Sequence, residues 1–147
     1  MPPPNEINAL ISFGNSLCYS LCENEIRHTH LNSKFSFIHS ASEKRHSLAL
    51  DIAEIFKPIF VDRLIFKLIN NKMLTKKHFE YIGNACLLNK NGKNIFLEEW
   101  KNKLNSTIYH RKLKRNVNYK ELVKLDIYKL EKYILNISDY EPFKIWW

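Results

Sequence analysis

The chain has 147 residues, 45% of them hydrophobic, which is enough for one ordinary core but short for two independent domains. Lysine and arginine number 23 against 15 aspartate and glutamate residues, and the formal charge of +8 favours an anionic partner such as nucleic acid. The apolar runs fall short of the roughly 18 residues that span a bilayer, and the odd number of cysteines argues against a disulfide framework, so we expect a cytoplasmic protein with no membrane segment.

The first part of the chain predicts one long helix. Asn5 has the side chain of an N-cap, and apolar residues then recur at three- and four-residue spacing up to about Arg27. Residues 28–36 form a polar connection, and we expect Phe35 and Phe37 to anchor it to the core.

Two mostly apolar helices are predicted next. The first covers about residues 47–57 and meets Pro58, which cannot continue the preceding hydrogen-bond ladder but can open a new helix that runs to Ile69. Their apolar character indicates that both lie deep in the fold. The acidic residues within them are therefore conspicuous: Asp51, Glu54 and Asp62.

The second half of the chain gives weaker signals. Residues 79–92 alternate around Gly83 and allow a small hairpin, with a turn at Asn91 and Gly92. Helical periodicity resumes over residues 93–104 and again over about 118–135. The predicted class is mostly α: a single helical-bundle-like domain over residues 1–147, with room for one small β-hairpin.

The segment 37–58 contains side chains that suit a divalent metal ion. Helical residues three apart share a face, so Asp51 and Glu54 can present two carboxylates to one point. Mg²⁺ and Mn²⁺ prefer oxygen ligands, and an imidazole such as that of His39 suits Mn²⁺ as a third ligand. The alternative is that His39 is an ordinary boundary histidine and that the carboxylates pair with a nearby base: Arg45, Lys57 or Arg63.

Basic residues concentrate between Lys101 and Lys124, where Glu121 is the one acidic residue. Such a run is either a phosphate-binding surface or a solvated helix face. His110 is interpreted as a surface residue of this run. A separate zinc set, Cys18, Cys22, His28 and His30, is less favoured than ordinary burial of the two cysteines.

Four segments, taken in chain order, resemble the helical C-terminal domain of the CRISPR-associated endonuclease and integrase of the Cas-one family: NEINALISFGNSL, FIHSASEKRHSLALDIAEIFKPIFVDRLIFKLIN, LLNKNGKNIFLEEW and YEPFKIWW. The match covers essentially the whole chain. Its most specific part is a histidine followed, about a dozen residues later, by an acidic pair three apart. The resemblance implies a metal-dependent DNA endonuclease and integrase that inserts spacer DNA into a CRISPR array in antiviral defence.

The resemblance also implies roles for individual residues. His39 and Glu54 match metal ligands for Mn²⁺ or Mg²⁺, and Asp51 matches an acidic residue that supports them, so these three are the expected catalytic residues. The expected contacts with double-stranded DNA, both prespacer and array, are Arg63, Arg111, Lys112, Lys114 and Arg115. Arg63 fits a buried ion pair as well, and we favour that role because it follows Asp62 in an apolar helix.

The sequence departs from the family pattern at its beginning. Family members carry an N-terminal β-rich domain, which helps to form a homodimer and to hold a Cas-two partner protein, and a further metal-binding glutamate upstream of the segment that matches PPPNEINAL. No residue here matches that glutamate, so we expect a C-terminal fragment with weakened metal affinity and little activity alone. The alternative is a non-catalytic DNA-binding or structural remnant of the family. Trp146 and Trp147 are expected to dock on the core or on a partner.

Overall fold

The computed structural model describes residues 5–32 and 47–144 of the chain. The elements are α1 (Glu6–Arg27), α2 (Ser47–Lys57), η1 (Pro58–Asp62), α3 (Arg63–Asn70), η2 (Lys76–His78), β1 (Phe79–Ile82), β2 (Ala85–Leu88), α4 (Lys90–Asn105), β3 (Thr107–His110), β4 (Arg115–Asn118) and α5 (Tyr119–Ile134). The mostly α class is confirmed.

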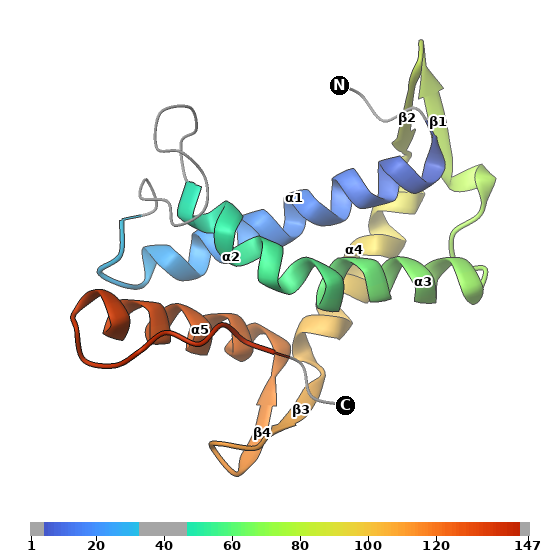
Figure 1. The fold of residues 1–147 in the computed structure, drawn as a ribbon. Coiled ribbons are helices and arrows are strands. Elements are labelled where there is room, and N and C mark those ends of the chain that lie inside the picture. The colour runs from blue at the N-terminus through green and yellow to red at the C-terminus, as the bar shows by residue number, and fades with distance from the viewer. Residues whose placement is uncertain (1–4, 33–46, 145–147) are drawn as a thin grey trace.

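The helices pack around the continuous path of α2, η1 and α3 (Figure 1). Helix α1 lies beside α2 and η1, α5 contacts α1, α2 and α4, and α4 also contacts α3. Two antiparallel hairpins lie at opposite ends: β1–β2 near the start of α1, and β3–β4 between α4 and α5. No helix of the described part of the chain is long and apolar enough to cross a membrane.

Asparagine side chains cap the starts of three helices. The Oδ1 atoms of Asn5, Asn89 and Asn118 accept backbone N–H bonds from the residue three positions on, at 2.9, 2.9 and 2.7 Å. The cap at Asn89 makes α4 begin earlier than expected, so the predicted turn at Asn91 and Gly92 is wrong and Gly92 lies inside the first turn of α4. The hairpin itself is confirmed, but its turn is at Gly83, whose φ of 60° suits glycine.

Pro58 does not end the helical path. Its nitrogen carries no hydrogen to donate to the preceding turn, and the chain passes through the π-helical turn η1 at this point before α3 continues. The predicted pair of buried helices is therefore confirmed, as one path that a π-helical turn interrupts.

The hairpin β3–β4 was not predicted from the sequence. It pairs Thr107 with Asn118 and His110 with Arg115, and residues 111–114 form the turn. The alternation of buried apolar and exposed residues that predicts a strand is weak here, because Val117 is the one buried apolar residue of the two strands. His110 is buried as well, at 7% exposure, so its interpretation as a surface residue was wrong.

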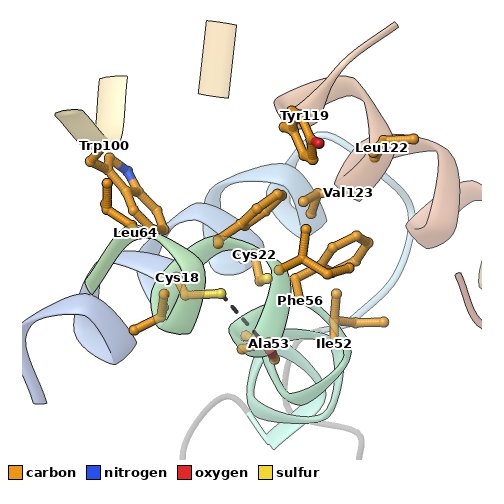
Figure 2. Packing of buried hydrophobic residues seen from close by; sticks show 14 of the residues in the cluster. Cys18, Cys22, Ile52, Ala53, Phe56, Leu64, Trp100, Tyr119, Leu122 and Val123 are labelled. Carbon is orange, nitrogen blue, oxygen red and sulfur yellow. Dashed lines mark hydrogen bonds between the residues drawn. The ribbon is translucent and has the colours of Figure 1, made fainter. Parts of the chain in front are cut away.

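The core is organised around two aromatic rings, Phe56 at the end of α2 and Phe60 in η1, whose centroids lie 5.4 Å apart. Phe60 also meets Trp100 of α4 at 6.1 Å and Tyr119 of α5 at 5.8 Å. Phe56 stacks on Phe143 of the C-terminal segment at 5.7 Å. Side chains of these helices converge on one cluster, shown in Figure 2, where the Cys18 thiol also donates to the carbonyl oxygen of Ala53 at 3.8 Å.

Gly14 allows the close approach of α1 to η1. A Cβ atom at this position would lie 2.6 Å from Cγ1 of Val61 and 3.2 Å from Cζ of Phe96. Neither neighbour can rotate away easily, because both side chains are fully buried.

We expect Gly14→Ala to lower the free energy of unfolding by about 1–3 kcal/mol through overpacking. This loss would outweigh the gain of about 1 kcal/mol that alanine brings to a helix interior. Urea denaturation measures the change, and adding Val61→Ala should reduce the effect of Gly14→Ala because the contacting methyl group is gone. A stabilising Gly14→Ala would contradict the close approach of the two helices.

Candidate metal and nucleic-acid site

The two acidic residues of α2 have different environments. Asp51 is buried, at 4% exposure, whereas the Glu54 side chain is 53% exposed. Glu54 accepts an ion-pair contact from Lys57, one turn further along the same helix. The ion pairing that the sequence left open is therefore present for Glu54, while His39 and Arg45 lie outside the described residues.

The acidic side chains of α2 are of the kind that binds a hard divalent cation. Asp51 and Glu54 are carboxylates one helical turn apart, which is the ligand type that Mg²⁺ and Mn²⁺ prefer. Within residues 5–32 and 47–144, no three His, Cys, Asp or Glu side chains lie close enough to hold a metal ion. The described residues thus contribute two potential oxygen ligands, and the role of His39 stays a prediction.

The predicted DNA-binding residues fall into two groups. Arg63 is half-buried on α3. Burial first, and then the charges of Arg63 and Lys67, lower the pKa of Lys103 on α4. The Lys103 ammonium lies 3.9 Å from the centroid of the Tyr119 ring. Arg63 therefore belongs to a basic cluster between α3 and α4.

The other four candidates lie together at the end of the β3–β4 hairpin. Arg111, Lys112 and Lys114 are exposed in its turn, and Arg115 begins β4. Arg115 pairs with Glu121, and Lys112 Nζ lies 3.3 Å from Glu141 Oε2. The structure thus concentrates charge on one projecting turn, which the linear run of basic residues did not reveal.

Sequence reasoning missed Asp126, an acidic residue of α5 that is 1% exposed. Its carboxylate accepts bonds from the Tyr140 hydroxyl at 2.8 Å, the Phe143 backbone N–H at 2.8 Å and Lys129 Nζ at 3.2 Å. Burial, followed by the charge of Asp126, raises the pKa of Tyr140. Asp126 thereby holds residues 140–144, here called the C-terminal strap, against α5. Its position between Val123 and Ile127 on the apolar face of α5 was the available signal.

The alternative zinc set is wrong. Cys18 and Cys22 are free thiols in the core, whereas His28 and His30 are exposed. His30 Nδ1 lies 3.1 Å from Glu131 Oε1, on α5. Ordinary burial explains both cysteines.

Comparisons with known proteins agree over nearly the whole chain. The family model described as CRISPR associated protein Cas1 matches residues 1–102. "CRISPR-associated endonuclease Cas1 2" of Moorella thermoacetica is 53% identical over 146 residues, which are 99% of this chain and 46% of that protein. The chain thus spans a little under half the length of the curated relatives it matches.

Two solved structures share the fold. A Cas1 protein from Thermotoga maritima superposes with a TM-score of 0.89 at 41% identity, covering 95% of this chain and 43% of that chain. A casposase bound to integration product superposes with a TM-score of 0.88, covering 99% of this chain and 43% of that one. The casposase is 23% identical in sequence, so this second likeness concerns the fold alone.

We expect Asp126→Asn to lower the free energy of unfolding by about 2 kcal/mol, because an amide cannot accept all the bonds that the carboxylate accepts and turns a donor toward other donors. Asp139→Asn is the matched control, since Asp139 makes the same charge change at an exposed position just before the strap. Urea denaturation of both variants gives the comparison. Equal stabilities of the two variants would contradict the clamping role of Asp126.

Proposed function

The chain belongs to the Cas1 family of CRISPR-associated proteins, and from that premise we propose that it is the helical metal-binding domain of a DNA endonuclease and integrase of CRISPR adaptation. The observation that carries this proposal is the pair of carboxylates, Asp51 and Glu54, one turn apart on α2. Relatives of this chain are named endonucleases, but the chain covers 46% of the first of them, so the activity of a whole protein is part of the proposal.

The proposed site joins Asp51 and Glu54 with His39 as holders of Mn²⁺ or Mg²⁺. When bound, the metal would activate a DNA 3′-hydroxyl and stabilise charge on the attacked phosphodiester. Asp51 and Glu54 would have different roles at this site. Asp51 is buried and keeps one carboxylate at a defined place on α2, whereas the exposed Glu54 can exchange Lys57 for the metal.

The proposed partners follow from charge and from the family. The exposed cations of the β3–β4 turn and the cluster around Arg63 would contact double-stranded DNA of the prespacer and of the array. The family resemblance adds a homodimer and a Cas2 partner protein, acting in the cytoplasm. Two carboxylates and one imidazole are fewer ligands than Mg²⁺ or Mn²⁺ usually takes, so we propose weak metal binding by these three residues alone.

A second candidate function is a DNA-binding domain without catalysis. The ion pair between Glu54 and Lys57 favours it, since that pair satisfies the carboxylate without a metal. The two candidates share the DNA-binding surface and differ in the response to a divalent cation.

Mn²⁺ should raise the melting temperature of the chain if α2 holds a metal. At ten times the dissociation constant, binding adds about 1.4 kcal/mol, equivalent to a rise of about 3–6 °C for a domain of this size. The rise should disappear in Glu54→Gln and in His39→Ala and persist in Glu98→Gln, an exposed position on α4. An equal rise in Glu54→Gln and Glu98→Gln would favour the non-catalytic candidate.

Lys57 should compete with the metal for Glu54. We expect Lys57→Gln to tighten Mn²⁺ binding about two- to fivefold, because it removes both a partner of the carboxylate and a like charge beside the cation. Lys90→Gln, at an exposed position of α4, controls for the net charge. Isothermal titration measures the affinities, and weaker binding by Lys57→Gln than by Lys90→Gln would contradict the competition.

A further inference from the structure

A cleft of about 420 Å³ lies between the β3–β4 turn, α5 and the C-terminal strap. In Figure 1 the chain after α5 turns back and runs along α5 toward this hairpin. Four cationic side chains contribute to its lining: Arg111 and Lys112 from the turn, Lys129 from α5 and Lys144 from the strap. Among the described residues that line the cleft, Glu141 is the one carboxylate, so this part of the wall carries a net positive charge.

Two of the cations of the cleft, Lys112 and Lys129, contact Glu141. Lys112 Nζ lies 3.3 Å from Glu141 Oε2, and these two side chains are 79% and 78% exposed. An ion pair so open to water contributes little and exchanges readily. Lys129 Nζ donates to the backbone carbonyl oxygen of Glu141 at 3.3 Å and to Asp126 at 3.2 Å. Glu141 thus places its carboxylate on Lys112, in a position that another anion can take.

His110 lies in the wall of the same cleft, beside its cations. The ring is buried at the wall, and its Nδ1 accepts the Leu113 backbone N–H at 3.1 Å, so the neutral ring carries its proton on Nε2. Burial first, and then the charges of Lys129, Arg115 and Lys112, lower the pKa of His110. The charges that disfavour the imidazolium would favour a bound anion.

We propose that this basic cleft binds a backbone phosphate of a DNA strand, and that the Glu141 carboxylate leaves Lys112 when the phosphate enters. The two unesterified oxygens of a phosphodiester accept bonds from guanidinium and ammonium groups together. The inference rests on the proposed function for its choice of DNA as the ligand. It adds a site on the hairpin, α5 and the strap, apart from the carboxylates of α2.

The strap connects the cleft to the metal-binding helix. Tyr140 and Glu141 line the cleft, and two residues later the ring of Phe143 stacks on Phe56 of α2 at 5.7 Å. A strand held in the cleft is therefore held at a constant position relative to α2, the helix of Asp51 and Glu54. This gives the phosphate contact a positioning role for the strand.

Two variants with opposite expected effects test the cleft. The double variant Arg111→Gln, Lys112→Gln should bind a short labelled DNA duplex about five- to tenfold more weakly at about 0.1 M salt. The slope of log Kd against log salt concentration should also decrease by about 1. Glu141→Gln should strengthen binding about two- to threefold by removing the competing carboxylate. Fluorescence anisotropy over a range of salt concentrations provides both quantities.

Matched controls make the same charge changes near the other hairpin. Lys77→Gln with Lys90→Gln repeats the loss of two positive charges, and Glu80→Gln repeats the loss of one negative charge. These residues are exposed and lie in η2, at the start of α4 and in β1. The controls should change the DNA affinity less than twofold. All the substituted side chains are exposed, and circular dichroism checks that each variant is folded.

The outcomes separate this proposal from the function on which it rests. If cleft and control variants change DNA affinity equally, net charge alone explains binding and the cleft proposal is overturned, while the Mn²⁺ response of α2 is unaffected. If the wild-type chain does not bind DNA, both proposals fall. Calorimetry with inorganic phosphate adds one more outcome: phosphate binding that Arg111→Gln abolishes, with DNA affinity unchanged, would assign the cleft to free phosphate and overturn the DNA assignment.

Discussion

The contact between Phe56 and Phe60 is the interaction on which the rest of the structure depends. Both rings are fully buried, and between them they meet an aromatic ring from α4, from α5 and from the C-terminal strap. Such aromatic pairs add directional preference to the large apolar area that they bury. Because α2 and η1 carry the two rings, the orientation of α2 is determined from three sides. The packing of α2 therefore also fixes the positions of the Asp51 and Glu54 backbones. The position of a carboxylate pair on a well-packed helix is more precise than that of a pair on a loop.

Periodicity predicted the long elements because each helix buries one stripe of apolar residues. The start of α4 was misplaced because NKNG contains two competing signals, an Asn-Gly turn and an Asn N-cap, and the cap at Asn89 is the one that forms. The β3–β4 hairpin escaped prediction because its inward residues are few and its turn is strongly basic. It also packs against α5, a contact that local sequence does not encode.

Part of the candidate site was also predictable from helical periodicity. Helical spacing was sufficient to pair Asp51 with Glu54, but it could not distinguish metal binding from the ion pair that Glu54 makes with Lys57. Asp126 and Glu141 act on residues more than ten positions away, and such pairings follow from the path of the strap, which single-sequence patterns do not specify. His39 stays a prediction, since it lies outside the described residues.

Two separate surfaces, the α2 carboxylates and the basic cleft, are joined through the stacking of Phe143 on Phe56. The central claim is that α2 is a metal-binding helix, and anomalous diffraction from a crystal of the chain containing Mn²⁺ tests it most directly. The account predicts an anomalous peak at bonding distance from the Asp51 or Glu54 carboxylate, with Glu54 turned away from Lys57. Manganese bound only elsewhere, with the Glu54–Lys57 pair intact, would contradict it.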